Sequence, residues 1–222
     1  MVLTLYKRDT SPPCRSVFMT LHALGITDVV YVDVDLPGGE HLTEEYIRMN
    51  PQHTIPLLKD DEFIIWDSHA ICFYLVEKYG KDNKLYPAEL KQRAVIHQRL
   101  HFNGEVLYNT LKNTVVLPVI YGTDKDFKPE NMDKIKATYS TTEKLLTKKW
   151  LAGDDATLAD ICCVSTISSM NEICPIDNKE YPRVAQWLKN CSKQQFYTRG
   201  NIPYISLFLE RVMRRLAENR SK

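Results

Sequence analysis

Residues 8–17, Arg-Asp-Thr-Ser-Pro-Pro-Cys-Arg-Ser-Val, contain two side chains that could do chemistry, the hydroxyl of Ser11 and the thiol of Cys14. Ser11 is placed to cap a helix, because Pro12 and Pro13 suit the first two helical positions, where no N–H is needed. The N–H of Cys14 and the positive end of the helix dipole would then face the helix start. The stretch therefore predicts an anion site, although a simple helix cap would use the same residues.

The stretch 50–56, Asn-Pro-Gln-His-Thr-Ile-Pro, could present backbone groups to a peptide ligand. A cis Ile55–Pro56 bond would bend the chain and leave the N–H and C=O of Ile55 facing outward. A bound peptide could pair with these groups as an added strand does. A trans proline at a strand edge is the other interpretation of the same residues.

Asp67 and Ser68, in the stretch Trp-Asp-Ser-His, precede an apolar helical run. Ser68 could cap that helix and offer its hydroxyl and N–H to a carboxylate. Asp67 could accept hydrogen bonds from an ammonium group. Capping alone would also explain both residues.

These three stretches fall at the ends of elements that the pattern of residues predicts within the first 80 positions. The predicted order is strand 2–6, helix 14–24, strand 29–34, helix 43–49, hairpin 54–59 with 63–66, and helix 69–79. Two strands joined by a helix favour a parallel pair with a crossover. We therefore expect a small mixed sheet with helices, βαβαββα, over residues 1–80.

Beyond a polar linker at residues 81–88 the sequence predicts only helices, in a second domain over residues 89–222. They are expected at 88–120, 129–149, 157–171, 181–193 and 202–219, with Pro118 kinking or ending the first. Thr157 and Asp160 form a capping box before an apolar run, so we interpret Asp160 as a folding residue and not a catalytic one.

Composition excludes several classes of function. The net charge is +1, which argues against a nucleic-acid binder, and no apolar run is long enough to span a membrane. Residues 1–80 carry a net charge of −6 and the remainder +7, which predicts attraction between two domains. The chain lacks a secretory leader and a C-x-x-C pair, so we expect a cytoplasmic protein with thiols in its core. His97 and His101 lie one helical turn apart without a third ligand, and no metal site is expected.

Taken together, the motifs S-P-P-C-R, N-P-Q-H-T-I-P, W-D-S-H-A-I and A-G-D-D-A-T-L-A-D resemble the insect delta and epsilon classes of cytosolic glutathione transferases, most of all epsilon. The resemblance covers residues 2 to about 200. It implies a thioredoxin-like N-terminal domain followed by an all-helical domain, and an enzyme that conjugates glutathione, its co-substrate, to small hydrophobic electrophiles in detoxification.

The resemblance also implies the glutathione-binding residues. Ser11 would donate a hydrogen bond to the sulfur, and Ile55 would pair with the cysteinyl backbone before a cis proline. The other expected contacts are His41 and His53 at the glycine end, Thr54 beside them, Asp67 and Ser68 at the γ-glutamyl end, and His69. Many relatives carry Glu at position 67 and Arg at position 69, so the role of His69 is left open.

The electrophile site is expected between the opening loop, the first long helix of the second domain and the C-terminal helix. Its candidate residues are Pro13, Leu36, Tyr108, Leu111, Lys112, Val115, Val116, Leu207 and Phe208. Epsilon relatives often have Arg where Lys112 stands and an acid where Val116 stands, which predicts a more apolar pocket here.

Two alternatives to a glutathione-conjugating enzyme use the same residues. One is a carrier of hydrophobic ligands that binds glutathione without catalysis. The other is a thiol transferase that acts through Cys14, which would require that thiol to be exposed. The resemblance further implies a homodimer.

Overall fold

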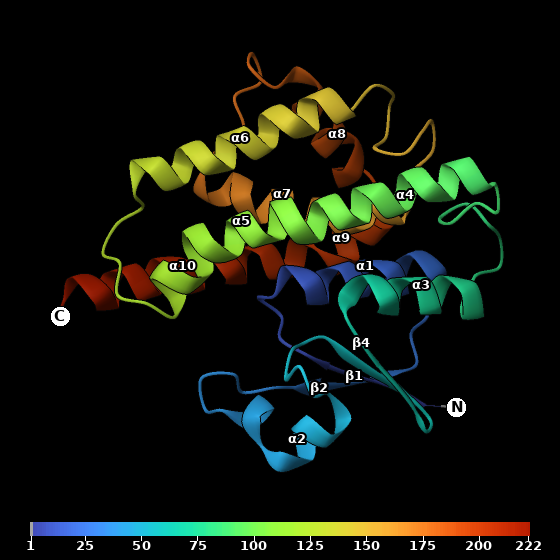
Figure 1. Cartoon of the computed structure of the whole chain (residues 1–222), viewed down its shortest axis with the longest axis horizontal. Coiled ribbons are helices and arrows are strands. Elements are labelled where there is room, and N and C mark those ends of the chain that lie inside the picture. The colour runs from blue at the N-terminus through green and yellow to red at the C-terminus, as the bar shows by residue number, and fades with distance from the viewer. Residues whose placement is uncertain (1) are drawn as a thin grey trace.

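A mixed four-stranded sheet organises the first 80 residues in the computed structural model, which describes residues 2–222 (Figure 1). The strand order is β2-β1-β3-β4, with bounds Leu3–Lys7 for β1, Val29–Asp33 for β2, Leu57–Asp60 for β3 and Phe63–Trp66 for β4. β1 pairs in parallel with β2 and antiparallel with β3, and β3 pairs antiparallel with β4. The expected βαβαββα order is therefore confirmed.

Helices α1 (Pro12–Leu24) and α3 (Ser68–Tyr79) lie on one side of the sheet, and α2 (Glu44–Met49) lies on the other (Figure 1). A short 3₁₀ turn, η1 (Glu40–Leu42), which the sequence did not predict, precedes α2. α1 ends at Gly25, whose φ of 70° is a left-handed conformation that favours glycine.

The second domain is helical throughout, as predicted. Its elements are α4 (Leu90–Phe102), η2 (Asn103–Tyr108), α5 (Asn109–Leu111), η3 (Lys112–Ile120), α6 (Pro129–Leu145), α7 (Leu158–Ile173), α8 (Pro182–Ser192), α9 (Gln195–Gly200) and α10 (Ile202–Arg220). The first four follow one another without a break, and η2 and η3 are π-helical. Pro118 lies inside η3, and the helix ends two residues later, at Ile120.

Helix α7 is the buried centre of the helical domain, and its start is fixed by Asp160. One carboxylate oxygen of Asp160 accepts from the N–H of Thr157 at 2.9 Å. The other accepts from the N–H of Leu151 at 2.9 Å and from the indole N–H of Trp187 at 2.8 Å. The capping box is present, which supports the folding role expected for this residue.

The two domains meet along α1, which packs against α7 and α9 on the side away from the sheet (Figure 1). The Ser16 hydroxyl lies 2.8 Å from that of Ser165. Arg15 is completely buried, and its guanidinium donates to the carbonyl of Ser165 at 2.9 Å and to the hydroxyl of Ser169. Helix α1, which Ser11 caps, is therefore packed between the sheet and the helical domain.

Candidate active site

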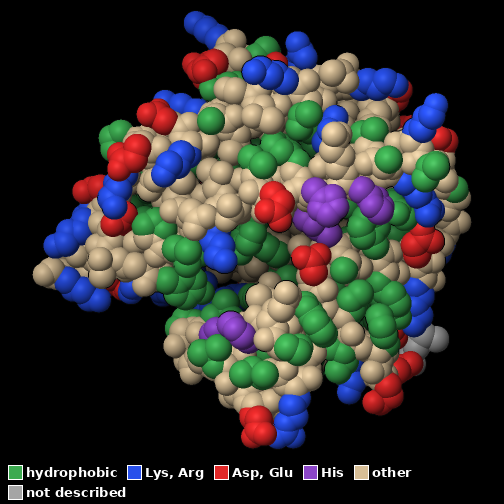
Figure 2. Space-filling view, in the orientation of Figure 1, with side chains coloured by type: hydrophobic (Ala, Val, Ile, Leu, Met, Phe, Trp, Pro, Cys, Tyr) green, Lys and Arg blue, Asp and Glu red, His purple; other side chains and the backbone are tan. Residues whose placement is uncertain are grey.

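A cleft of about 520 Å³ opens between the domains at the N-terminal end of α1. Figure 2 shows a hollow in this part of the face, between the helices and the sheet domain. Most of the residues that the sequence singled out line this cleft. They are Ser11, Pro13, Leu36, His41, His53, Thr54, Ile55, Tyr108, Lys112, Val116 and Phe208.

Ser11 forms the floor of the cleft where the chain turns from strand to helix. Its backbone is extended, with φ −84° and ψ 120°, and Pro12 and Pro13 follow at the first two helical positions. Its hydroxyl accepts from the N–H of Cys14 at 3.5 Å, which is long for a hydrogen bond. Because the hydroxyl oxygen is the acceptor in this contact, its own proton can be donated to an acceptor in the cleft.

The Cys14 thiol is completely buried and does not line the cleft. Burial raises its pKa to about 11, although hydrogen bonds from Arg8 and Ser11 act in the opposite direction. A protonated, inaccessible thiol is a poor nucleophile. The structure therefore argues against the thiol-transferase alternative.

Two imidazoles face each other on the sheet-domain side of the cleft. The ring centroids of His41 and His53 are 6.0 Å apart. The Nδ1 atom of His41 is buried and has no hydrogen-bond partner within residues 2–222. Burial, and secondarily the charge of His53, lower the pKa of His41. A carboxylate bound beside the ring would favour its protonated form.

The segment before β3 is held in place by its neighbours. The carbonyl of Thr54 accepts from the Tyr46 hydroxyl at 2.8 Å and from the Asn50 amide at 2.9 Å. The Ile55–Pro56 bond is cis, as the sequence suggested. The N–H and C=O of Ile55 make no hydrogen bond in the described part of the chain. A peptide ligand in the cleft could pair with them.

Asp67, Ser68 and His69 lie outside the lining of this cleft. Asp67 caps α3 through one carboxylate oxygen, which accepts from the N–H groups of His69 at 2.9 Å and Ala70 at 3.0 Å. Its φ of 73° is left-handed. Asp67 is exposed, whereas Ser68 is 9% exposed.

His69 points to the helical domain. The Asn103 amide donates to its Nε2 at 2.9 Å, and the Thr166 hydroxyl donates to the Asn103 carbonyl oxygen at 2.9 Å. Burial lowers the pKa of His69, which favours the neutral ring that this acceptor role requires. Its position explains why it does not line the cleft: its ring is engaged between the two domains.

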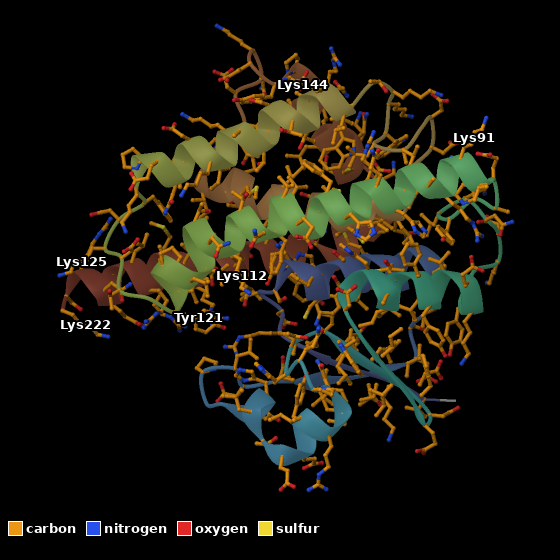
Figure 3. The ribbon with its side chains drawn as sticks, in the orientation of Figure 1. Lys91, Lys112, Tyr121, Lys125, Lys144 and Lys222 are labelled. Carbon is orange, nitrogen blue, oxygen red and sulfur yellow. The ribbon has the colours of Figure 1, made fainter. Side chains whose placement is uncertain are left out.

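The helical-domain wall contains Tyr108, Lys112 and Val116, which are spaced by four and share one face of the helix. Figure 3 shows Lys112 and Tyr121 on the side of this helix that faces the sheet domain. Three other candidates do not line the cleft. Leu111 and Val115, each one position earlier, are completely buried in the core, and Leu207 lines a neighbouring hollow.

Sequence reasoning missed two arginines in the lining, Arg8 and Arg211. Arg8 precedes α1, and Arg211 comes from α10, so no local motif connects them. These arginines and Lys112 all contribute positive charge to this end of the cleft, more than the candidate residues alone indicated.

The candidate histidine pair of α4 is engaged elsewhere. The Nε2 atom of His97 lies 2.7 Å from the Tyr86 hydroxyl. Among residues 2–222, no group of three or more His, Cys, Asp or Glu side chains could hold a metal ion.

None of the described helices is both long enough and apolar enough to cross a lipid bilayer.

Comparison with known proteins matches both halves of the chain. Residues 5–83 match the N-terminal domain of glutathione S-transferase, and residues 72–195 match its C-terminal domain. Glutathione S-transferase 1 of Manduca sexta is 50% identical over 218 residues, which are 98% of this chain and 100% of that protein.

Solved structures agree with this result. An epsilon-class glutathione S-transferase from the housefly Musca domestica has a TM-score of 0.91 at 38% identity, covering 96% of this chain and 98% of that one. A glutathione transferase homologue from Drosophila mojavensis, with bound glutathione, has a TM-score of 0.91 at 35% identity, with coverage of 96% and 97%. The chain belongs to the glutathione S-transferase family.

Proposed function

We propose that the Ser11 hydroxyl holds glutathione in its thiolate form for attack on small hydrophobic electrophiles. The observation that carries this proposal is the position of Ser11, which lines the cleft at the start of α1 and accepts from the Cys14 amide at a long 3.5 Å. The positive end of the α1 dipole favours negative charge at the same place. Ser11 forms no covalent bond in this mechanism, because it only stabilises charge.

The energy that the mechanism requires is modest. A free thiol has a pKa of about 8.5, and lowering it by about two units takes roughly 2.7 kcal/mol of preferential thiolate stabilisation. One charge-assisted hydrogen bond and a helix N-terminus together supply an amount of this size. The thiolate then attacks the electrophilic carbon, a C–S bond forms, and the leaving group departs with its electron pair.

Glutathione would lie along the sheet-domain side of the cleft. His41 and His53 would hold its glycine carboxylate, and Ile55 would pair with its cysteinyl backbone beside Thr54. Asp67 and Ser68 would hold the γ-glutamyl end, with the free carboxylate oxygen of Asp67 toward the ammonium. The electrophile would lie against Pro13, Leu36, Tyr108, Val116 and Phe208, which are on the cleft walls.

The proposed setting is detoxification in the cytoplasm by a homodimer, since the family to which the chain belongs is typically dimeric. Large apolar side chains remain exposed on β4 and η2, where Phe63 is 48% and Val106 is 38% exposed. Figure 2 shows apolar side chains gathered over α3 and β4. A second copy of the chain could cover such a surface.

The test is Ser11→Ala, assayed by conjugation of glutathione to a chloronitrobenzene. We expect kcat/KM at neutral pH to fall about 10- to 100-fold, as the fraction of thiolate falls. The rise of kcat/KM with pH should move upward by about two units. Ser11→Thr, which retains a hydroxyl, should keep most of the activity.

The same assay separates the alternatives. Cys14→Ala should remain active if Ser11 carries the chemistry and should be inactive if the protein is a Cys14-dependent thiol transferase. A wild-type protein that binds glutathione and a hydrophobic dye but turns over no aryl halide, epoxide or hydroperoxide would be a carrier. Unchanged kcat/KM in Ser11→Ala would rule out the mechanism proposed here.

A further inference from the structure

The electrophile end of the cleft is positively charged. Arg8, Lys112 and Arg211 line it from a loop and two helices, and its lining includes no Asp or Glu among the described residues. Most other residues of this wall are apolar or aromatic, among them Tyr108 and Phe208. A site for uncharged electrophiles alone has no need of this arrangement, because placing the partly buried Arg8 and Arg211 beside apolar surface costs free energy.

Arg211 is held in position by neutral groups. Its guanidinium donates to the Thr10 hydroxyl at 3.1 Å and to the Tyr121 hydroxyl at 3.3 Å, and it lies 5.5 Å from the centroid of the Tyr121 ring. It makes no ion pair with a carboxylate in residues 2–222. Because a guanidinium has five N–H donors in a planar fork, several of them are free for an anion in the cleft.

The surroundings of Arg211 increase its need for an anion. Burial lowers its pKa, the interaction with Tyr121 acts in the opposite direction, and the charges of Arg8 and Arg214 add smaller effects that lower it again. Arg8 itself has only a distant carboxylate, that of Asp35 at 3.9 Å. Arg93, by contrast, has a close carboxylate, that of Glu77 at 2.9 Å. A ligand carboxylate beside Arg211 would offset both desolvation and like-charge repulsion.

A neighbouring hollow on the other side of Arg211 limits where a ligand carboxylate can bind. This second hollow shares Arg8, Thr10 and Arg211 with the cleft, and Ser11 does not line it. Its walls carry four acids, Asp9, Asp33, Asp35 and Glu210. Because the outer hollow has four acids beside its three arginines and the cleft has none in its described lining, a ligand carboxylate is favoured on the cleft side of Arg211.

We propose that the preferred second substrate is an amphipathic electrophile with a carboxylate at one end, bound by the Arg211 guanidinium. Its apolar body would lie on Tyr108, Val116 and Phe208, and its reactive carbon would lie toward Ser11. Arg8 and Lys112 add attraction at longer range. This inference rests on the function proposed above and specifies the substrate class for the same cleft.

When the electrophile is an α,β-unsaturated ketone, glutathione is conjugated by addition and no leaving group departs. The thiolate sulfur adds to the β-carbon and forms a C–S bond, while the C=C π pair moves toward the carbonyl and gives an enolate. The enolate carbon then takes a proton from water. The proton lost from the thiol balances the one gained, and no oxidant or reductant is required.

The test compares a phenoxyacetic acid that carries such a ketone with its primary amide. Both molecules have the same reactive group, far from the acid, so they differ in charge and hardly in intrinsic reactivity. We expect wild-type kcat/KM to favour the acid by about tenfold, the size of one charge-assisted contact at a partly exposed site. The spontaneous rate of each compound with glutathione is subtracted.

Three variants assign the preference to a residue. Arg211→Gln should lower the acid-to-amide ratio about tenfold, to near one. Arg211→Lys should give an intermediate ratio, because the charge remains but the planar fork is lost. Arg214→Gln is the matched control: its guanidinium lines only the outer hollow, so the ratio should not change. Turnover of the amide confirms that each variant is folded.

The possible outcomes separate this inference from the function on which it rests. A wild-type ratio near one, with both compounds dependent on Ser11, overturns the carboxylate site and leaves the conjugating function standing. A high ratio that persists in Arg211→Gln also overturns the role of Arg211. If neither these compounds nor a chloronitrobenzene is conjugated, the proposed function fails, and this inference fails with it.

Discussion

At the scale of single residues, protonation of the His41 ring should report glutathione binding independently of the ionisation of the glutathione thiol. Its Nδ1 is buried without a partner, and burial, with the charge of His53, lowers its pKa. The ring is therefore neutral over a wider pH range than a free imidazole. A glycine carboxylate beside it would favour the charged form and raise its pKa, so ligand binding should take up protons.

We predict net proton uptake, below one proton per site, when S-methylglutathione binds near neutral pH. The measurement is titration calorimetry in buffers of different ionisation enthalpy, and the methylated sulfur removes thiol ionisation from the result. Affinity should rise as pH falls toward the pKa of free His41. His41→Gln should abolish most of the uptake, whereas His101→Gln, at an exposed position, should not. Equal uptake in His41→Gln and wild type would contradict the assignment.

The sequence was most informative about residues whose roles depend on local backbone. Ser11, Pro12 and Pro13 specify a helix start within three positions, and the structure has it there. Arg211 could not be found in this way, because its contact with Thr10 joins positions 201 residues apart. Leu111 and Val115 were misplaced by one position on a helix whose π-helical turns no sequence pattern indicated.

At the scale of elements, the start of α7 should control the stability of the helical domain. Asp160 is completely buried and accepts from four donors of three residues, Thr157, Leu151 and Trp187. Asp160→Asn would place an amide N–H₂ against one set of these donors. We expect a loss of about 3 kcal/mol in the free energy of unfolding.

Thermal unfolding checks this value, since a loss of that size should lower Tm by roughly 10 °C in a chain of this length. Asp154→Asn is the matched control, because its side chain is 76% exposed and pairs only with Lys148. Exposed ion pairs contribute little to stability, so its Tm should not change measurably. Similar Tm values for both variants would show that the buried cap is dispensable.

The order of elements was predictable because each long element has a matching apolar period and a cap or turn at its end. The short ones were not. α9, six residues from Gln195 to Gly200, carries no cap signal of its own, and its glycine lies so close to Met19 of α1 that a side chain would not fit. Contacts with α1 specify that helix, and they are invisible in its local sequence.

At the scale of the whole molecule, close ion pairs do little to join the domains, and the longer-range attraction between their opposite net charges stays a prediction. Among the ion pairs of residues 2–222, Arg93–Glu77 alone connects the sheet domain to the helical one, and both side chains are partly exposed. A continuous apolar core across α1, α3 and α7 supplies most of the contact. We therefore expect salt to weaken domain docking only slightly.

The prediction for the whole molecule concerns its oligomeric state. Light scattering should give about twice the chain mass of 25.8 kDa, because exposed apolar residues such as Phe63 and Val106 favour burial in a second copy. The mass should persist at the concentrations used for activity assays. A single-chain mass under those conditions would contradict the proposed homodimer.

The buried Arg15 limits how this fold can be recombined. Its guanidinium starts in one domain and finds both of its partners, Ser165 and Ser169, in the other, while its Nε and Nη1 have none in the described chain. The backbone carbonyl at position 165 is available from any residue, but the side-chain oxygen at position 169 is not. A chimera that joins this N-terminal half to a foreign C-terminal half without that hydroxyl would leave a buried cation with less compensation, at a cost of up to several kcal/mol. Exchange between relatives is therefore constrained at Ser169, which does not line the cleft.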